Sequence, residues 1–595
     1  MAMVFGNMGE TSGTGVAFSR DPSTGENHFM AEYLINAQGE DVVAGIRTPM
    51  DISALEKQQP EIFKEITTIR NRLEKHYRDM QDMEFTVQEG KLFMLQCRNG
   101  KRTGPAAVKM AVDMVAEKMI TKEEALLRVK PDQLDQLLHP QFDAKALKSA
   151  KPLAAALNAS PGAGCGQIVF TADEAVEWDK AGKKVMLVRK ETSPDDIAGM
   201  YVAQGILTST GGRTSHAAVV ARGMGTPCVC GCADVVFVDK ETVKIGEKTF
   251  KKGDFISIDG STGKVYGEVI PVTPAAVSGD LETFLSWADD VRAKSVRTTP
   301  SGKKVKGFEV LANAEQNEAP QAFRFGAAGI GLCRTEHMFF EEPKLTSFQK
   351  MICSDTTEDR KENLKAILPL QQKDFYNIIK VMEGRAVTIR LLDPPLNEFV
   401  QAATAEEAAA LAKKLNVSVD FINKKYAELD EHNPMLGHRG CRLAITYPEI
   451  YEMQVEAIAR ATAQADKEGL KHDVRIMIPN VTTANELKQI RAQAEAVIAT
   501  VNADCGTKLK FQIGSMIEFP RAAATANAIA ECADFFSFGT NDLTQTTFGF
   551  SRDDYSKFID SYLDQKVLLQ DPFKTLDEDG VGVMIGLAEE KGRSV

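Results

Sequence analysis

Residues 511–542 read F-Q-I-G-S-M-I-E-F-P-R-A-A-A-T-A-N-A-I-A-E-C-A-D-F-F-S-F-G-T-N-D. The segment opens with an apolar run that ends at Glu518, and an alanine-rich stretch follows. It closes with a second apolar run that ends at Asn541 and Asp542. Short apolar runs that alternate with helical stretches are typical of parallel strands covered on both faces. The segment therefore predicts one strand–helix–strand unit of a (β/α) barrel.

The same alternation extends over residues 305–595. Further candidate strands are V-L-A-N (310–313), G-I-G-L-C-R (329–334), A-V-T-I-R-L-L-D (386–393), M-L-G-H-R-G (435–440) and V-R-I-M-I-P-N (474–480). Several of these runs end in Arg, Asp or Asn, and the functional residues of such barrels lie at the carboxyl ends of strands. After Asp542 the last predicted element is a helix near residues 582–591. We therefore expect a TIM-type (β/α)8 barrel that the chain truncates before strand eight.

Four regions that differ in composition and hydrophobic pattern precede the barrel, so the predicted class is an α/β multidomain protein. Residues 1–100 mix Gly-rich turns with short strands, one of them at 16–18, and a helix is expected between about residues 51 and 79. M-E-F-T-V-Q (83–88) and K-L-F-M-L-Q-C-R (91–98) alternate as a hairpin does. The predicted regions are a helical linker at 101–150, a compact α/β domain at 151–272 and a second linker at 273–304.

Composition excludes several classes. The 595 residues carry a formal net charge of −12, which disfavours a generic nucleic-acid binder but not small anionic ligands held by local Arg and N–H groups. No apolar run of about 18 residues is present, so no membrane span is expected. The cysteines of C-V-C-G-C (228–232) lack a second pair at zinc spacing and are interpreted as buried strand residues.

The stretch T-S-T-G-G-R-T-S-H-A-A-V-V-A-R-G-M-G (208–225) places His216 after a glycine pair and two hydroxyl residues. The Ala- and Val-rich run that follows predicts a helix, so the imidazole lies at a helix N-terminus, where backbone N–H groups favour anions. A histidine that accepts a phosphoryl group needs such donors. We therefore select His216 as the candidate catalytic nucleophile.

The predicted strand ends of the barrel carry the groups that enolate chemistry needs, which are acidic ligands for a divalent metal and Arg donors for phosphate and carboxylate. Glu518 and Asp542 follow two predicted strands, and two carboxylates at adjacent strand ends suit Mg²⁺. Arg334, Arg390 and Arg439 lie at or near three further strand ends. Guanidinium groups bind phosphate and carboxylate in a two-pronged fashion, so these arginines are candidates for holding a phosphorylated carboxylic acid.

G-G-x-T-S-H-A-A-V-V-A-R-G-M-G (211–225) resembles the phosphohistidine loop of the pyruvate phosphate dikinase family. The resemblance covers the whole chain. It implies interconversion of ATP, phosphate and pyruvate with AMP, pyrophosphate and phosphoenolpyruvate (PEP), through a phosphorylated His216 on a swivelling domain. It also implies regulatory phosphorylation at Thr214. The implied substrate positions are Arg334, Arg390, Glu518, Gly539, Thr540, Asn541 and Asp542, with the metal on Glu518 and Asp542; Arg439 is added from its own context.

D-M-E-F-T-V-Q-E-G-K-L-F-M-L-Q-C-R (82–98) resembles the end of an ATP-grasp domain. The resemblance implies that ATP and its Mg²⁺ are held by Asp82, Glu84, Gln96 and Arg98. Glu84 and Gln96 share one face of the hairpin only if the strand register allows it.

The chain is accordingly expected to be a fragment of such a dikinase that lacks the N-terminal part of the ATP-grasp domain and the C-terminal end. The family motif C-G-E-H-G-G, whose Cys protonates the enolate, is missing, and Cys532 does not match it. Two alternatives stay open: a phosphoenolpyruvate synthase and a non-catalytic paralogue. The resemblance further implies a homodimer of the full-length protein, a regulatory kinase or phosphatase as partner, and a cytoplasmic location, with plastid or glycosome as alternatives.

Overall fold

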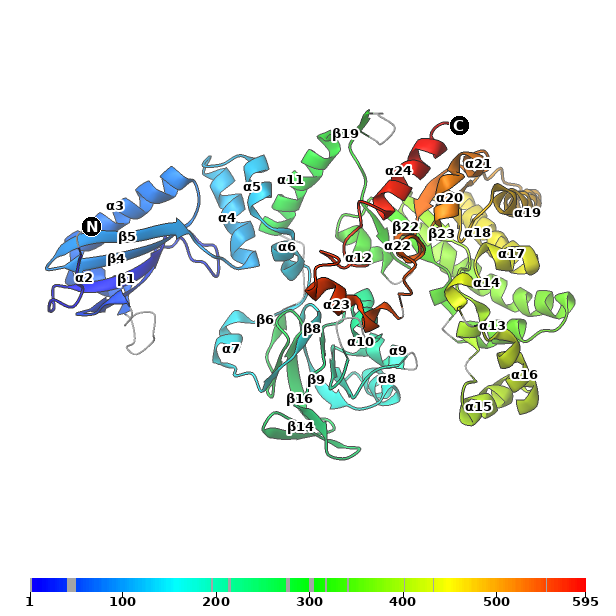
Figure 1. The fold of residues 1–595 in the computed structure, drawn as a ribbon, viewed down its shortest axis with the longest axis horizontal. Helices are drawn as coiled ribbons and strands as arrows, with labels where there is room; N and C mark the ends of the chain where they lie inside the picture. The colour runs from blue at the N-terminus through cyan, green and yellow to red at the C-terminus, as the bar shows by residue number, and fades with distance from the viewer. Residues whose placement is uncertain are drawn as a thin grey trace. The chain divides into compact units, whose positions relative to one another are not determined.

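The computed structural model describes residues 3–39, 50–193, 196–211, 216–273, 279–298, 304–315, 318–339, 342–400, 402–431, 433–552 and 554–595. The chain divides into two compact units, Met1–Arg292 and Ala293–Val595. The structure is of mixed α/β class throughout (Figure 1). Within the described residues, every helix is too short or too polar to cross a membrane.

The first sheet has the strand order β3-β2-β1-β4-β5, and all of its pairs are antiparallel. Its strands are β1 (Gly13–Phe18), β2 (Met30–Ile35), β3 (Met50–Asp51), β4 (Gln81–Gln88) and β5 (Lys91–Asn99). The predicted hairpin is confirmed as β4 and β5. Glu89 and Gly90 both have positive φ, 48° and 72°, as a two-residue type I′ hairpin turn requires.

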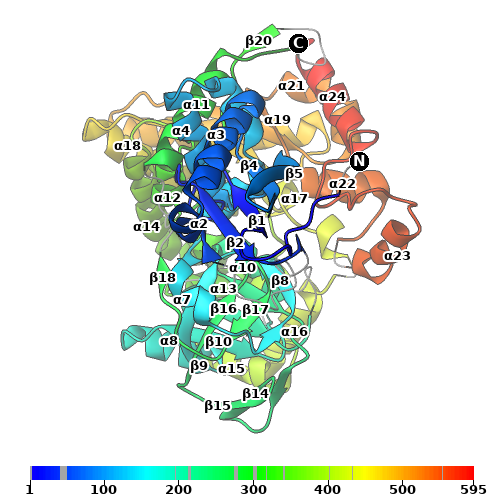
Figure 2. The ribbon, with the colours of Figure 1, turned by 90° about the vertical axis from the view of Figure 1, so that its left-hand side faces the viewer.

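The helix expected at 51–79 is wrong as a single element. It consists of α2 (Ile52–Gln58) and α3 (Pro60–Tyr77). Pro60 lacks a backbone N–H and therefore begins a helix more readily than it continues one. Leu55, Ile62 and Ile66 of these helices belong to the same buried cluster as the sheet residues Tyr33 and Phe85, and Figures 1 and 2 show the two helices beside the sheet.

The predicted helical segment after β5 contains α4 (Gly104–Ala116), α5 (Lys122–Arg128), α6 (Pro131–Leu137) and α7 (Ala144–Ser149). α4 and α5 share a buried cluster with Phe284 and Trp287 of α11 (Asp280–Lys294). A short pair of strands, β6 (Gln141–Phe142) and β18 (Val272–Thr273), joins the two ends of the domain that lies between these segments.

That domain is built on an eight-stranded sheet with four parallel central strands, β9 to β12. Its strands are β7 (Ala154–Ala155), β8 (Leu157–Ser160), β9 (Ala163–Val169), β10 (Val185–Arg189), β11 (Gly205–Thr208), β12 (Cys228–Cys230), β16 (Phe255–Asp259) and β17 (Lys264–Tyr266). Its helices are α8 (Ala172–Lys180), α9 (Ile197–Val202) and α10 (His216–Met224). A three-stranded sheet of β13 (Val235–Phe237), β14 (Thr242–Ile245) and β15 (Lys248–Lys251) completes it.

Alternate strand residues point to opposite faces of this sheet. Leu187 and Ile206 form a cluster with the three helices, whereas Val188 and Leu207 form another with the small sheet. Cys228 and Cys230 are fully buried on β12, as predicted for strand cysteines.

The second unit contains a six-stranded sheet whose strands follow one another in chain order, each parallel to the next. They are β21 (Leu311–Asn313), β22 (Gly329–Arg334), β23 (Ala386–Arg390), β24 (Asp473–Ile478), β25 (Gln512–Ile517) and β26 (Phe536–Phe538). A separate two-stranded sheet pairs β19 (Val296–Thr298) with β20 (Lys304–Lys306). The six-stranded sheet contains six of the seven strands predicted for residues 305–595.

The helices of this unit are α12 (Ala319–Arg324), α13 (Lys344–Ile352), α14 (Thr357–Met382), α15 (Ala405–Leu415), α16 (Val419–Leu429), α17 (Cys441–Thr446), α18 (Pro448–Lys467), α19 (Ala484–Cys505), α20 (Pro520–Ala524), α21 (Ala526–Ala530), α22 (Thr540–Phe548), α23 (Ile559–Asp564) and α24 (Val581–Gly592). α24 confirms the helix expected near residues 582–591. α14 and α18 pack along one another, and their inward residues share a buried cluster with the sheet.

The strand predicted at 435–440 is wrong. A 3₁₀ turn occupies Pro434–Leu436, and α17 starts at Cys441. The apolar run is only two residues long, and Arg442 donates from its side chain to the carbonyl oxygens of Leu436 and Gly437. Side-chain hydrogen bonds therefore replace a strand ladder along this loop.

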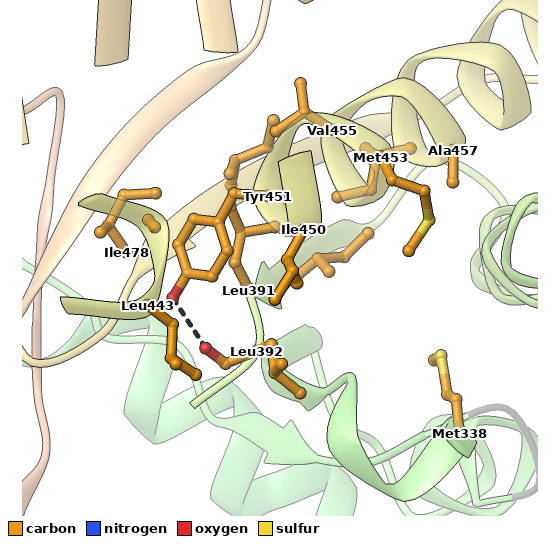
Figure 3. Packing of buried hydrophobic residues seen from close by; sticks show 14 of the residues in the cluster. Met338, Leu391, Leu392, Leu443, Ile450, Tyr451, Met453, Val455, Ala457 and Ile478 are labelled. Carbon is orange, nitrogen blue, oxygen red and sulfur yellow. Dashed lines mark hydrogen bonds between the residues drawn. The ribbon is translucent and has the colours of Figure 1, made fainter. Parts of the chain in front are cut away.

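Tyr451 of α18 fixes the loop that follows β23. Its hydroxyl donates to the carbonyl oxygen of Leu392 at 2.7 Å, and its ring lies among Leu391, Leu443 and Ile450 (Figure 3). A buried hydrogen bond of this kind holds the backbone one residue before Asp393.

Candidate functional site

The strand ends of the second unit meet at one edge of the parallel sheet. The register places Arg334 opposite Arg390 and Ile517 opposite Phe538. Arg334 and Arg390 end their strands, and Glu518 directly follows β25, as the sequence predicted. The carboxyl ends of parallel strands are where such folds bind ligands.

Asp393 joins the two buried arginines of this edge. Arg390 Nη1 lies 2.8 Å from Asp393 Oδ2, and Arg439 Nη2 lies 2.5 Å from the same oxygen. Arg439 Nη2 is also 3.6 Å from Asp542 Oδ2, and Arg390 Nη2 donates to Glu336 Oε1. The predicted residues Arg390, Arg439 and Asp542 are thus brought together through a carboxylate that the prediction did not include.

Both guanidinium groups stay charged in spite of burial. Burial lowers the pKa of Arg390, but the negative charges of Glu336 and Asp393 outweigh it and raise that pKa above its ordinary value. The pKa of Arg439 is raised in the same way by Asp393 and Asp542. Nε of each arginine is buried without a hydrogen-bond partner in the described part of the chain, so one donor of each guanidinium group is unused there.

Glu518 carries the most strongly perturbed carboxylate of the site. It is fully buried, and its Oε1 accepts from the backbone N–H of Asn480 at 2.6 Å. Burial, followed by the charges of Asp393 and Asp542, raises the pKa of Glu518 well above its usual range. A cation at this edge would relieve that repulsion between carboxylates.

The G-T-N-D motif forms the start of α22. Gly539 precedes the helix, Thr540 and Asn541 are exposed in its first turn, and Asp542 Oδ1 accepts from Gln545 Nε2 at 3.0 Å. A Cβ on residue 539 would lie 2.4 Å from Glu518 Oε2, so only glycine leaves this carboxylate its room. The N–H groups of a helix N-terminus favour an anion beside this position.

The donor set fits Mg²⁺. Within the described ranges, no group of three or more His, Cys, Asp and Glu side chains is arranged to hold a metal ion. Mg²⁺, however, is usually bound through one or two carboxylates together with water and substrate oxygens. Glu518 and Asp542 are two carboxylates that influence each other electrostatically, as the raised pKa of Glu518 records.

Glu336, Asp393 and Asn480 are site residues that the sequence reasoning missed. Each follows a strand of the parallel sheet within three residues. The signal was therefore the one that selected Glu518, a polar residue directly after an apolar run. The sequence reasoning used this signal for Arg, Glu and Asp at some strand ends, but it did not consider every polar residue that follows a strand.

His216 is the first residue of α10, as predicted from the sequence. Ala217, Ala218 and Ala221 of this helix are buried, so one face of the helix is anchored on the domain. Thr214 lies outside the described residues.

The register of the β4–β5 hairpin places Glu84 and Gln96 on the same face, which the sequence left open. Glu84 is paired with Gln96, and Asp82 with Arg98, so the members of each pair share a face. Asp82 Oδ2 lies 2.7 Å from Arg98 Nε, and this hydrogen bond raises the pKa of Arg98. Asp82 is buried and Arg98 exposed, and Asp82 Oδ1 has no partner among the described residues.

Three sequence families match the chain. Residues 290–595 match the family described as PEP-utilising enzyme, PEP-binding domain, and residues 181–263 match PEP-utilising enzyme, mobile domain. Residues 1–64 and 53–119 match pyruvate phosphate dikinase, AMP/ATP-binding domain. The first of these families covers more than half of the chain.

Curated relatives extend over the same length. The chain is 53% identical to pyruvate, phosphate dikinase of Clostridium symbiosum over 99% of its own length and 66% of the relative's. It is 51% identical to the chloroplastic pyruvate, phosphate dikinase of Mesembryanthemum crystallinum, over 100% of its own length and 61% of the relative's. It is also 51% identical to the pyruvate, phosphate dikinase of Rhizobium meliloti, over 100% and 66%. The chain thus spans between 61% and 66% of the length of these relatives. It belongs to the PEP-utilising enzyme family, and its relatives in that family are pyruvate, phosphate dikinases.

Proposed function

We propose that this chain carries the phosphohistidine and PEP-binding parts of a pyruvate phosphate dikinase. The observation that carries the proposal is the edge at which Arg390, Arg439, Asp393 and Glu518 converge inside the region that matches a PEP-binding domain. Buried arginines that remain charged suit the phosphate and carboxylate of PEP, and the carboxylates suit a divalent cation.

The reaction divides into two phosphoryl transfers. In the first, the bond between the α- and β-phosphates of ATP breaks, so that AMP leaves, the β-phosphoryl group passes to the imidazole of His216, and the γ-phosphate leaves with inorganic phosphate as pyrophosphate. In the second, the phosphoryl group passes from His216 to the enolate oxygen of pyruvate, which forms PEP. Because one histidine serves two sites, its domain must move between them.

The residues of the edge have distinct tasks in the second transfer. Arg390 and Arg439 neutralise the phosphoryl oxygens and the carboxylate of the substrate, and Thr540 and Asn541 offer the N–H groups of the first turn of α22. Glu518 and Asp542 would hold Mg²⁺, which supplies positive charge for the enolate oxygen when it is bound.

The N-terminal sheet would serve the first transfer. Asp82, Glu84, Gln96 and Arg98 would form the end of an ATP-grasp site, with carboxylates for Mg²⁺ and Arg98 for the polyphosphate.

The proposal extends to an eight-stranded barrel and a homodimer for the full-length protein. It includes regulatory phosphorylation at Thr214 and a cytoplasmic location.

A phosphoryl-transfer experiment tests the function. The full chain is incubated with Mg²⁺ and PEP that carries a ³²P-labelled phosphate, and acid-labile label on the protein is measured. We expect label on the unaltered chain and none on His216→Asn. His76→Asn, which changes an exposed histidine of α3, is the matched control and should keep the label. Label on His216→Asn, or none on the unaltered chain, would contradict the proposal.

A second arm separates the two related enzyme classes. The labelled chain is freed of PEP and mixed with AMP plus pyrophosphate, or with AMP plus phosphate. A dikinase forms labelled ATP only with pyrophosphate, whereas a phosphoenolpyruvate synthase needs phosphate. A labelled chain that forms ATP in neither mixture would show phosphoryl transfer from PEP alone, whereas a chain that binds PEP but takes up no label in the first arm would support a non-catalytic role.

A further inference from the structure

Asn480 contacts two carboxylates of the PEP-binding edge at once. Its backbone N–H donates to Glu518 Oε1 at 2.6 Å, and its side-chain Nδ2 donates to Asp393 Oδ1. The residue is fully buried in the loop after β24. It therefore links the carboxylate assigned to the cation with the carboxylate that binds both arginines.

The backbone of Asn480 has an unusual conformation, in which its N–H group faces Glu518 while its side chain faces Asp393. Its φ is 57°, in the left-handed region that asparagine tolerates better than most other residues. The neighbouring loop presses on the amide, because a Cβ on Gly440 would lie 2.5 Å from Asn480 Nδ2. Since Gly440 follows Arg439, the amide is packed between the arginine loop and Asp393.

The pattern of hydrogen bonds points to a role in the site rather than in stability. Asn480 Oδ1 is buried and has no donor within the described part of the chain, which costs stability. The donor side of the same amide is used on Asp393. This leaves Asp393 Oδ2 for Arg390 and Arg439, and Glu518 Oε2 on the side of Gly539.

We propose that Asn480 is a positioning residue that fixes the directions of Asp393 and Glu518, and thereby the placement of the two arginines and the cation. The inference rests on the proposed function of this edge. Asn480 acts through its neighbours and is not assigned a contact with substrate.

Asn480→Gly isolates the side chain. Glycine keeps the backbone N–H for Glu518 and adopts positive φ readily, but it removes the amide from Asp393. Asn416→Gly is the matched control, because Asn416 is an exposed asparagine with φ 58° at the end of α15. The full chain is titrated calorimetrically with oxalate, a mimic of the pyruvate enolate, in the presence of Mn²⁺, and thermal unfolding is followed in parallel.

We expect Asn480→Gly to bind oxalate roughly 10- to 100-fold more weakly, the effect of losing a hydrogen bond to a charged group. Its unfolding temperature should stay well above the temperature of the titration, so that the weaker binding is measured on a folded chain, and Asn416→Gly should bind as the unaltered chain does. Equal oxalate affinity for Asn480→Gly and the unaltered chain would overturn the inference and leave the proposed function intact.

Crystal structures of the ligand-free unaltered chain and of Asn480→Gly supply a readout that does not depend on binding. We expect the Asp393 carboxylate to turn away from its present direction in the variant, with Arg439 following it. An unchanged Asp393 would overturn the inference. If the unaltered chain itself binds no oxalate, the proposed function fails, and these two structures still decide the role of Asn480.

Discussion

Gly539 provides the space that the carboxylate of Glu518 occupies. Gly539 has no positive φ, so it is not needed for a turn; it is needed because Glu518 lies against it. A Cβ on residue 539 would be 2.4 Å from Glu518 Oε2 and 2.9 Å from Glu518 Cβ. Both distances are below 3.0 Å, which real Cβ atoms essentially never show, so Glu518 or its surroundings would have to shift.

Gly539→Ala should therefore displace Glu518 and weaken phosphoryl transfer to His216. A misplacement of about 1 Å in such a site can cost roughly 100-fold in rate, which is the effect we expect. The rate of ³²P transfer from PEP measures it. Gly582→Ala is the control, because a Cβ there meets Asp577 O at an ordinary 3.5 Å. A transfer rate for Gly539→Ala equal to that of the control would show that Glu518 can move without loss.

The pH dependence of one residue follows from its contacts. Burial raises the pKa of Glu174, but the N–H groups of Phe170 and Thr171 and the ammonium of Lys252 outweigh it, so the pKa is lowered overall. The folded pKa thus lies below the unfolded one. The stabilisation is complete above the unfolded value of about 4.3 and is lost as the pH falls through the folded value.

Glu174→Gln should accordingly lower the unfolding temperature at pH 7, and the difference from the unaltered chain should shrink toward pH 3. Glutamine keeps the capping geometry of α8, so the change reports mainly the charge. Differential scanning calorimetry at both pH values measures the effect. Glu177→Gln, an exposed residue of the same helix, should show little difference at either pH. A Glu174→Gln deficit that is the same at pH 3 would contradict the assignment.

Residue identities were the most predictable part of the site. Arg390, Glu518 and Asp542 could be selected because each ends or follows an apolar strand, and the structure brings them to one edge. The partners of these residues were not predictable in the same way. The link from Asp393 to Asn480 depends on the left-handed backbone of Asn480 and on the approach of Gly440, which a sequence pattern does not express.

Elements were predictable where hydrophobic period and boundary signals agree. The hairpin of β4 and β5 has alternating strands and a Glu-Gly turn, and both appear in the structure. The strand at 435–440 was mispredicted because Met435 and Leu436 resemble a strand when they are counted alone. The charged side chains that hold this loop, Glu431 and Arg442, lie outside the apolar run.

Capping explains where α19, the helix that follows β24, begins. Thr483 Oγ1 accepts from the N–H of Glu486 at 3.2 Å, and Glu486 Oε2 accepts from the N–H of Thr483 at 2.8 Å. This reciprocal pair starts α19 just after the loop that contains Asn480. The cap therefore fixes the end of the loop as well as the start of the helix.

Thr483→Ala should destabilise the second unit by about 1 kcal/mol, the usual cost of losing an N-cap hydroxyl. Chemical denaturation followed by circular dichroism measures the change. Thr500→Ala is the control within the same helix, since Thr500 is exposed and its hydroxyl only bonds back to Ala496 O. That variant should be neutral or slightly stabilising, because alanine is the better helix former. A cost at Thr500 as large as at Thr483 would argue against a capping effect.

At the scale of the whole molecule, the proposed site residues are divided between the two units. The first contains His216 and the paired residues of the β4–β5 hairpin. The second contains Arg334, Arg390, Arg439, Asp393, Asn480, Glu518 and Asp542, together with a buried cluster of its own that includes the inner faces of α14, α18 and α19. A unit with its own core and a full set of binding residues does not need the other unit for binding.

Residues 293–595 expressed alone should therefore fold cooperatively. They should bind oxalate in the presence of Mn²⁺ with the affinity of the full chain, within about threefold, because distant and independent parts contribute additively to within a few tenths of a kcal/mol. Residues 1–292 should not bind oxalate. Only the full chain should take up label from PEP, because His216 lies in the first unit and the substrate residues lie in the second. Calorimetry on the two parts and the labelling assay on all three proteins measure this division. Loss of oxalate binding in a cooperatively folded 293–595 would mean that residues of the first unit complete the site, and the assignment of substrate contacts to the strand ends alone would then be wrong.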